Sequence, residues 1–338
     1  FTFPGRKHKY SDFEWNWTDF DGIDYNNQTG ENAIFKFVDK KWGAEVDEEF
    51  GNFDYLMGAD LDFSNPRVVK ECKDWGRWYL DLTKVDGFRL DAVKHIDANF
   101  YKEWIQTLRD ESKKELFAVG EYWSTDVNRL HRYITETEGK ISLFDVPLHY
   151  NFFNASNDPN YNMSQILEHT LVKENPCMAV TFVDNHDTQP GQALQSFVQG
   201  WFKSIAYSII LLRNDGYPCI FYGDYYGIEH DHIEPENDLK TLMLIRKEKS
   251  YGLQHDYFDH NNFIGWTQEG DDEHISSGLA VVISNAGDGY KRMYVGNQNV
   301  GETYIDCLGN CEEEVTIDEE GCGNFGVKSR SVSVWIKK

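Results

Sequence analysis

The sequence has 338 residues, of which 40% are hydrophobic and 27% are charged, a balance that is typical of a globular protein and excludes a disordered chain. A formal net charge of −24 argues against nucleic-acid binding, because affinity for a phosphate backbone depends on clustered Lys and Arg. The longest apolar run, near residues 205–212, is too short to cross a bilayer and predicts a buried helix segment. We therefore expect a neutral polymer or small molecule as partner, and neither a nucleic acid nor a membrane.

The first 65 residues show little helical periodicity. They are rich in Trp, Tyr, Phe, Asp and Gly, which predicts an irregular segment rather than a βα unit. Helical and strand-like segments alternate from Pro66 onward. Pro66 is predicted to begin a helix whose apolar positions step by three and four. These positions are Val68, Cys72, Trp75, Tyr79 and Leu82.

Five short apolar segments in the middle of the chain are predicted strands. They are residues 85–93, 116–123, 143–150, 178–187 and 218–227. Helices are predicted between them, the first capped by Asp97, and the others near 126–134, 163–171 and 192–213. Strands separated by helices predict a parallel sheet, and right-handed crossovers make it a barrel or a doubly wound sheet.

After about residue 256 the pattern changes to short strands broken by Gly, Asn and Asp turns, with no predicted helix between them. This pattern predicts a separate antiparallel β-domain. The predicted segments of the chain are therefore 1–65, 66–255 and 256–338.

Acidic side chains stand at the ends of three predicted strands. Because side chains alternate along a strand, Arg89 and Asp91 share a face, and Arg89 would keep the Asp91 carboxylate ionised. Glu121 ends the next strand, and His186 and Asp187 end a later one. The acids are about one and then two βα repeats apart, which predicts equivalent heights at the face where α/β barrels place their active sites.

Each of these acids also has a structural interpretation. A single strand-end Asp is more often a helix cap, and Arg89 with Asp91 alone can be a structural ion pair. Three such acids in register are costly to bury unless a site uses them. Two carboxylates and a third suit glycosidic cleavage, in which one acid protonates the leaving oxygen and another attacks the anomeric carbon or activates water.

The segments around these acids resemble a known family. GFRLDAVKH, GEYW and FVDNHDTQPGQ are similar to three signature segments of the α-amylase family of glycoside hydrolases. YLMGADLDF, CIFYGDYYG and QHDYFDHNNFIGW resemble the liquefying bacterial α-amylases in particular. The resemblance implies a (β/α)8 TIM barrel, here with strands 4 to 8 only, an irregular B-domain remnant and a C-terminal antiparallel β-sandwich. It also implies endo-hydrolysis of α-1,4-glucosidic bonds in starch, glycogen or maltodextrins with retention.

The resemblance assigns roles to single residues. Asp91 would be the nucleophile, Glu121 the general acid/base and Asp187 the stabiliser of the transition state. Five further residues would contact substrate, with Arg89 also supporting Asp91, His186 at the cleavage point, and Lys94 and His95 on the leaving-group side. These five are Arg89, Lys94, His95, Trp123 and His186.

A calcium ion is also implied, where the family's irregular B domain meets the barrel. Asp54, Asp60 and Asp62 match its ligands, together with the carbonyl of His95, and Asp21 matches a neighbouring metal ligand. Oxygen donors of this kind suit Ca²⁺. Without the resemblance, DYLMGADLD is simply an acidic loop.

Some metal positions depart from the family pattern. Gly43 stands where close relatives have an Asp shared between metal sites, which puts a second metal in doubt. Asn262 and Asn285 stand in place of acidic ligands of a further calcium site between the barrel and the C-terminal domain.

The family's first three barrel strands have no counterpart in this sequence. An unclosed barrel exposes strand edges and apolar interior, so we expect the chain by itself to be neither active nor a stable monomer, whereas the complete enzyme is expected to be monomeric. Two alternatives stay open, a transglycosylating relative and a catalytically silent α-glucan-binding fragment. The first residues show no signal peptide, but a chain without an initial Met leaves localisation open, with the cytoplasm slightly favoured.

The six cysteines fall into two groups. Cys72, Cys177 and Cys219 stand alone and are predicted to be buried thiols. Cys307, Cys311 and Cys322 lie close together, which leaves a disulfide or a metal site open, although their spacing fits no strong zinc pattern and no His accompanies them.

Overall fold

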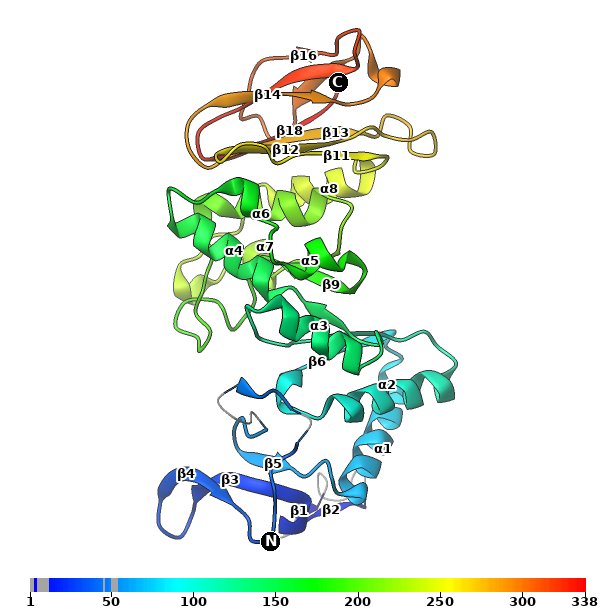
Figure 1. Cartoon of the computed structure of the whole chain (residues 1–338), viewed down its shortest axis with the longest axis vertical. Helices are drawn as coiled ribbons and strands as arrows, with labels where there is room; N and C mark the ends of the chain where they lie inside the picture. The colour runs from blue at the N-terminus through cyan, green and yellow to red at the C-terminus, as the bar shows by residue number, and fades with distance from the viewer. Residues whose placement is uncertain (1–2, 5–11, 45, 50–53) are drawn as a thin grey trace. The chain divides into compact units, whose positions relative to one another are not determined.

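The computed structural model of the chain describes residues 3–4, 12–44, 46–49 and 54–338 (Figure 1). The chain divides into two compact units. Unit 1 comprises Phe1–Ser124 and Asn128–Phe144, and unit 2 comprises Thr125–Val127 and Asp145–Lys338. Over the described ranges, none of the helices combines the length and apolar character that spanning a membrane requires.

Unit 1 begins with a small antiparallel sheet. Its strands β3 (Phe20–Asn26), β4 (Glu31–Lys36) and β5 (Ala59–Leu61) pair in the order β4-β3-β5, beside a short pair of β1 (Phe3–Pro4) and β2 (Glu14–Trp15). The absence of a βα unit before residue 66 was predicted, but this sheet was not. Strand β4 is almost wholly exposed, so its sequence lacks the apolar–polar alternation that marks a half-buried strand.

The rest of unit 1 alternates helices and parallel strands as predicted. The order is α1 (Pro66–Thr83), β6 (Gly87–Leu90), α2 (Ala98–Ser112), β7 (Phe117–Gly120), α3 (Val127–Glu136) and β8 (Ser142–Phe144). Asn65 caps α1 through the amide of Arg67, and Asp97 caps α2 through the amide of Asn99. Strands β6, β7 and β8 pair in parallel, which brings their C-terminal ends to one edge.

Unit 2 has a second pair of parallel strands, β9 (Ala179–Phe182) and β10 (Tyr217–Cys219). Its helices are α4 (Val146–Asn157), α5 (Leu171–Glu174), α6 (Gly200–Leu212), α7 (Tyr222–Tyr226) and α8 (Leu239–Glu248). Single 3-10 turns also occur along the two units. They are η2 (Trp17–Asp19), η4 (Val93–His95), η5 (Met163–Gln165), η6 (Pro176–Met178), η7 (Glu229–Asp231) and η8 (Asn297–Asn299).

Four predicted segments in this region are wrong. The predicted strand 218–227 ends at Cys219, and residues 222–226 form helix α7 instead. The predicted strand 143–150 ends at Phe144, because Asp145 accepts a hydrogen bond from the amide of Leu148 and starts α4. The predicted helix 163–171 is a 3-10 turn followed by turns, with α5 beginning only at Leu171. The predicted helix 192–213 begins at Gly200. Helix α8 was not predicted, although Leu239, Leu242 and Ile245 are buried at helical spacing.

The C-terminal part of unit 2 is antiparallel, as predicted. One sheet has the order β11-β12-β13-β18-β15-β16, and β14 pairs with β17 in a second. A core that includes Phe325 and Trp335 lies within this part. The strands are β11 (Gln254–Tyr257), β12 (Phe263–Gln268), β13 (Leu279–Ser284), β14 (Gly289–Tyr294), β15 (Thr303–Asp306), β16 (Val315–Thr316), β17 (Cys322–Val327) and β18 (Ser331–Lys337).

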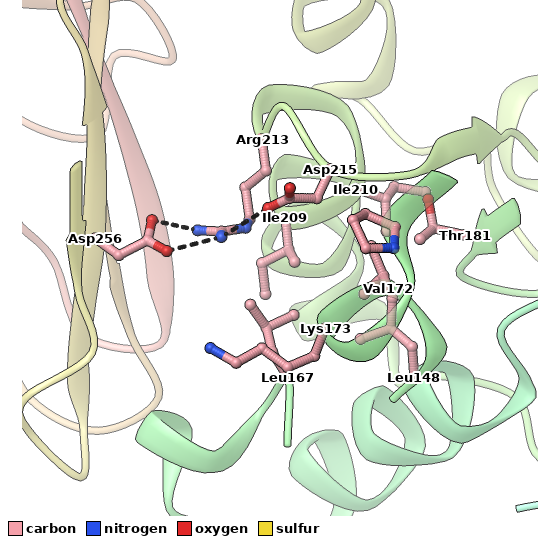
Figure 2. Close-up of a pocket in the computed structure, with 11 residues that line it drawn as sticks. Leu148, Leu167, Val172, Lys173, Thr181, Ile209, Ile210, Arg213, Asp215 and Asp256 are labelled. Carbon is pink, nitrogen blue, oxygen red and sulfur yellow. Dashed lines mark hydrogen bonds and ion pairs between the residues drawn. The ribbon is translucent and has the colours of Figure 1, made fainter. Parts of the chain in front are cut away.

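The end of α6 is joined to β11 by an ion pair between the buried Arg213 and the more exposed Asp256. The Arg213 guanidinium, 5% exposed, contacts both carboxylate oxygens of Asp256 at 2.7 and 2.9 Å and lies 3.2 Å from Asp215 (Figure 2). These groups border a cavity of about 190 Å³ whose other walls include Leu148, Val172 and Ile210. None of the predicted site residues lines this cavity.

The cysteine prediction is partly wrong. Cys177 is exposed in η6, whereas Cys72 and Cys219 are half-buried, and burial raises the pKa of the Cys72 thiol to about 11. Cys307, Cys311 and Cys322 are free thiols.

Candidate active site

The first candidate acid, Asp91, follows directly after strand β6. The chain turns at Ala92, which has left-handed backbone angles (φ 45°, ψ 42°) and begins η4. Residues other than Gly rarely adopt this backbone conformation, and those that do are concentrated at functional sites. The turn leaves the side chain of Asp91 71% exposed at the end of the strand.

Arg89 contacts both candidate catalytic acids of unit 1, Asp91 and Glu121. Its guanidinium forms an ion pair with Asp91 through Nη1, and its Nη2 lies 2.9 Å from Oε2 of Glu121. Strands β6 and β7 pair Arg89 with Val119 and Leu90 with Gly120, so parallel register places Asp91 and Glu121 together at the strand ends. The structure thus brings together Asp91 and Glu121, two of the three acids that were predicted to lie at equivalent heights, with Arg89 in contact with both.

Glu121 is buried, in contrast to Asp91. Its residue is 7% exposed, its Oε2 accepts a 3.4 Å hydrogen bond from the amide of Ala92, and its Oε1 has no hydrogen-bond partner among the described residues. Burial raises the pKa of Glu121, the Arg89 guanidinium lowers it, and the neighbouring Asp91 carboxylate raises it again. The net direction is upward, as a general acid requires.

Lys94 and Trp123 lie in contact beside these acids. The ammonium of Lys94 donates to the carbonyl of Trp123 at 3.0 Å and lies 3.1 Å from Oε2 of Glu49. His95 is buried in η4, next to Lys94. Lys94, His95 and Trp123 therefore occupy the segments that follow β6 and β7, whereas Arg89 lies on β6 itself.

Asp47 is a residue that the sequence did not single out. Its carboxylate accepts hydrogen bonds from the hydroxyl of Tyr122 and, at 2.6 Å, from Nη1 of Arg129, and its amide donates to the carbonyl of Lys94 at 3.0 Å. Asp47 thereby fixes the residue next to Glu121 and the backbone of Lys94. These bonds and the neighbouring cation lower the pKa of Asp47 despite its burial. The only signal in the sequence was an acid-rich run, VDEE, which is more often a solvated surface.

The third candidate acid, Asp187, belongs to unit 2 and follows strand β9. Nε2 of the exposed His186 lies 3.3 Å from Oδ2 of Asp187. The side-chain oxygen of Asn185 accepts from the amides of Asp187 (2.9 Å) and Thr188 (3.0 Å), which closes a tight turn around the acid. The convergence of Asp187 with the acids of unit 1 stays a prediction.

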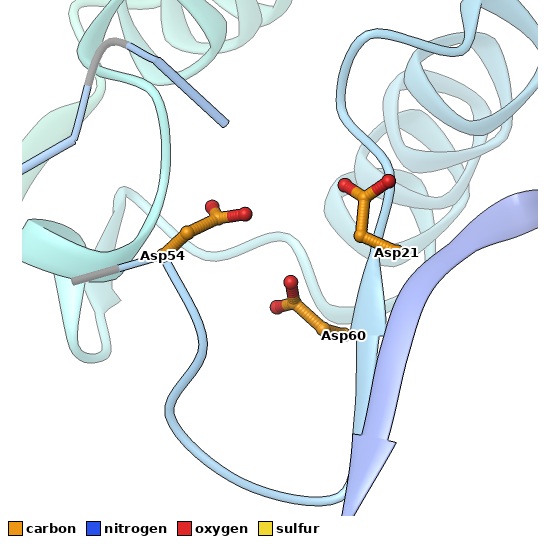
Figure 3. A group of neighbouring side chains, drawn as sticks. All are labelled: Asp21, Asp54 and Asp60. Atoms are coloured by element: carbon orange, nitrogen blue, oxygen red, sulfur yellow. The ribbon is translucent and has the colours of Figure 1, made fainter. Parts of the chain in front are cut away.

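Three of the five predicted metal residues contribute to one cluster in unit 1. Carboxylate oxygens of Asp21, Asp54 and Asp60 lie within 4.8 Å of one another (Figure 3). Burial, followed by the neighbouring carboxylates, raises the pKa of Asp60 to about 8, and burial and Asp62 raise that of Asp21 to about 7. Oδ2 of Asp60 is buried and has no hydrogen-bond partner among the described residues. Crowded oxygens with an unsatisfied buried atom fit a hard cation such as Ca²⁺.

Asp62 is placed differently from the other predicted ligands. Its carboxylate pairs with the ammonium of Lys40 and accepts from the amide of Ser64 at 2.9 Å, which lowers its pKa. Gly43 donates its amide to Oδ2 of Asp54 at 2.6 Å, and a Cβ at this position would lie 2.8 Å from Oδ1 of Asp54. A side chain at position 43 would therefore displace the Asp54 carboxylate.

Asn262 and Asn285, which stand where the family has acidic calcium ligands, form a hydrogen bond with each other within unit 2. Nδ2 of Asn262 donates to Oδ1 of Asn285 at 2.9 Å, and Nδ2 of Asn285 donates to the carbonyl of Tyr161 at 2.8 Å. Amide hydrogen bonds thus connect the turn before β12 to the end of β13 and to the segment after α4.

Comparisons with known proteins cover almost the whole chain. Residues 4–274 match the family model "Alpha amylase, catalytic domain" and residues 279–336 match "Alpha-amylase C-terminal". An α-amylase of Geobacillus stearothermophilus is 51% identical over 342 residues, which cover 100% of this chain and 62% of that protein. The "Cytoplasmic alpha-amylase" of Escherichia coli is 45% identical, covering 99% of this chain and 71% of that protein.

A solved structure is similar in fold. The α-amylase of Geobacillus thermoleovorans in complex with acarbose superposes with a TM-score of 0.64 at 19% identity, covering 84% of this chain and 67% of that one. The chain therefore spans about two thirds of the length of these proteins.

Proposed function

This chain belongs to the α-amylase family, and on that premise we propose that it carries the catalytic acids of an α-amylase. The proposed reaction is endo-hydrolysis of α-1,4-glucosidic bonds in starch, glycogen or maltodextrins, with retention of anomeric configuration. One observation carries the proposal most directly. An exposed acid, Asp91, and a buried acid of raised pKa, Glu121, share a single cation, Arg89.

The different surroundings of the two acids support different roles. Asp91 is exposed and paired with Arg89, which favours a carboxylate that can attack the anomeric carbon. Glu121 is buried and its pKa is raised, which favours a protonated acid that can donate to the leaving oxygen. A buried carboxyl group of raised pKa beside a second, exposed carboxylate is the arrangement expected of an acid/base and a nucleophile.

The proposed reaction proceeds in two displacements. In the first, Asp91 forms a bond to the anomeric carbon as the glycosidic C–O bond breaks, and Glu121 gives its proton to the departing oxygen. In the second, Glu121 takes a proton from water, whose oxygen attacks the anomeric carbon and releases Asp91. Two inversions give net retention. In this scheme Asp187 stabilises the positive charge that develops on the sugar ring in both transition states.

The remaining predicted residues are proposed to bind substrate. Lys94, held by Glu49 and the carbonyl of Trp123, offers a positioned ammonium to sugar hydroxyls. The Trp123 ring is proposed to supply an apolar face for a sugar ring. His95 is proposed to line the same side from η4. His186, exposed beside Asp187, is proposed to contact the sugar at the point of cleavage.

We also propose a calcium site at the carboxylate cluster. Asp21, Asp54 and Asp60 would supply oxygen ligands. Asp62 would become a further ligand once its ion pair with Lys40 breaks, and the carbonyl of His95 would complete the coordination. The bound ion would supply positive charge that neutralises these carboxylates. The unsatisfied Oδ2 of Asp60 supports this proposal.

The domain organisation forms part of the same proposal. Residues 1–65 would be a B-domain remnant, residues 66–255 strands 4 to 8 of an eight-stranded barrel, and residues 256–338 the C-terminal β-domain. The parallel pairing within β6-β7-β8 and within β9-β10 supports the barrel assignment. We further favour a cytoplasmic location, which the similar protein of E. coli supports and cell fractionation tests.

The decisive experiment measures reducing-sugar release from soluble starch by the protein as its gene encodes it, with Glu121→Gln as control. Proton NMR of the first product should show the α anomer, whereas a β anomer would exclude Asp91 as nucleophile. Binding of starch without cleavage would instead indicate a silent α-glucan-binding protein. Formation of longer oligosaccharides from maltodextrins would indicate a transglycosylating relative.

A further inference from the structure

A lysine lies inside unit 2 between two carboxylates. Nζ of Lys203, on α6, is 2.6 Å from Oδ2 of Asp184 and 2.6 Å from Oδ1 of Asp224, and the three side chains are only 4%, 0% and 2% exposed. The hydroxyl of Tyr207 donates to the other oxygen of Asp224 at 2.6 Å. The ammonium also lies 3.6 Å from the centre of the Phe197 ring.

Burying these three charged side chains in the core has a large free-energy cost. Removing charges from water costs several kcal/mol per ion, and apolar side chains of the same volume often replace buried ion pairs without loss of stability. Most other buried residues of helix α6 are apolar, among them Phe202, Ile205 and Ile209, and Lys203 is the only charged one. A charged group at this position therefore calls for a role other than stabilising the core.

Asp184 connects the lysine to the turn that carries Asp187. Its Oδ1 accepts from the hydroxyl of Thr188 at 2.8 Å, and the same hydroxyl oxygen accepts from the amide of Asn185 at 3.0 Å. Asn185 in turn accepts from the amides of Asp187 and Thr188. The amide of Asp187 is thus connected to the ammonium of Lys203 through four successive interactions, by way of Asp184, Thr188 and Asn185.

A second buried side chain holds the ends of this turn. Nδ1 of His149 lies 2.6 Å from the carbonyl of Val183, and its Nε2 lies 2.8 Å from Oγ of Ser196. The amide of Ser196 donates to the carbonyl of Thr188 at 3.0 Å. The turn is therefore fixed from α4 and from α6, while the side chains of His186 and Asp187 remain accessible to solvent.

We propose that Lys203, Asp184 and Asp224 are positioning residues, which set the direction of the Asp187 carboxylate through Thr188 and Asn185. This inference rests on the proposed function, because it assumes that Asp187 acts on substrate. The lysine touches neither Asp187 nor the solvent-facing edge of the turn. Its contribution is to keep the turn in one conformation during the reaction.

The test compares Lys203→Met with Arg213→Met in the full-length protein. Both cations belong to α6 or its end, both are about 95% buried, and both pair with carboxylates, but only Lys203 connects to the Asp187 turn. Misplacing a reacting group by about 1 Å can cost about 10²-fold in rate. We expect Lys203→Met to lower kcat on maltooligosaccharides by about that factor with little change in KM. Arg213→Met should lower Tm and leave kcat unchanged.

Thr188 provides a test that leaves the buried charges intact. Thr188→Val removes the hydroxyl that connects Asp184 to the turn, whereas Thr188→Ser keeps it. We expect the Val variant to lose kcat as Lys203→Met does and the Ser variant to recover most of it, with both folded in thermal unfolding. This pair keeps the inference testable even if Lys203→Met fails to fold.

Failure of the proposed role of Asp187 and failure of the positioning inference would give different results. If Asp187→Asn retains activity, the proposed role of Asp187 is wrong. If Asp187→Asn abolishes activity while Thr188→Val and a folded Lys203→Met keep the kcat of Arg213→Met, the role of Asp187 stands and the positioning inference is wrong.

Discussion

Nη2 of Arg89 lies 2.9 Å from Oε2 of Glu121, so the arginine that pairs with the exposed acid also contacts the buried one. Sequence spacing had assigned Arg89 to Asp91 alone. Burial raises the pKa of Glu121 and the Arg89 guanidinium lowers it. The protonation of Glu121 therefore depends on the positive charge of Arg89.

Arg89→Met should move the pH profile as well as lower activity. Without the guanidinium, burial and Asp91 both raise the pKa of Glu121, and only the hydrogen bond from the Ala92 amide still lowers it. A general acid must be protonated, so the alkaline limb of kcat/KM should move to higher pH. The measurement is kcat/KM on a maltooligosaccharide from pH 5 to 10. An alkaline limb that stays at the wild-type pH would show that it does not report Glu121.

Asp91→Asn and Glu121→Gln should each remove nearly all activity while preserving the fold. Loss of acid–base catalysis alone typically costs about 10²–10⁴ in rate. Asp86→Asn is the matched control, since this acid lies just before β6 with its side chain 97% exposed and should leave kcat unchanged. A tenth of the wild-type turnover in either site variant would refute the assignment, provided that circular dichroism shows a native fold.

Calcium should stabilise the protein through the carboxylate cluster. A ligand that binds only the native state at a hundredfold excess over its Kd adds about 2.7 kcal/mol. Thermal unfolding in chelator and in millimolar Ca²⁺ should therefore differ, and Asp60→Asn should abolish the difference. Asp24→Asn is the control, because Asp24 lies on the same strand as Asp21 but caps the amide of Gly58 at 2.8 Å. An equal response of both variants to calcium would place the ion elsewhere.

His149 should make stability fall on acidification. Burial lowers its pKa from 6.5 to about 4, so between these values the unfolded chain binds a proton that the folded protein excludes. The contribution of neutral His149 to the free energy of unfolding is fully present above about pH 6.5. It is lost as the pH falls towards 4, by roughly 3 kcal/mol in all. His149→Gln removes the titration. Urea unfolding at pH 7 and pH 4.5 should show a smaller loss for the variant than for the wild type, and equal losses would be inconsistent with a buried neutral His149.

The helices of unit 1 were predictable because their signals are local. Asn65 and Asp97 cap α1 and α2, and apolar residues recur at helical spacing behind them. The segment 143–150 failed because its apolar residues suit either state. Asp145 followed by Pro147 is itself a helix-start signal, and it could have corrected the prediction.

The candidate site was predictable only in part. Parallel strands place their C-terminal residues at one edge, so Arg89, Asp91 and Glu121 could be brought together from their positions alone. The contact of Arg89 with Glu121, and that of Asp47 with Tyr122, depend on side-chain directions across loops of irregular backbone. In the sequence, Lys203 is simply the one charged residue of a mostly apolar helix, and nothing local identifies its two partners.

The bond between Arg213 and Asp256 has a consequence for dissecting the protein. A chain cut just before residue 256 would leave a buried guanidinium with only Asp215 beside it, and would remove Trp266, whose indole donates to the carbonyl of Leu212 at 2.8 Å. The last turn of α6 would then lose both its charged and its aromatic neighbour. Strands β11 and β12 thus serve as the cap of this helix, and a shortened protein that is to remain folded must end after them.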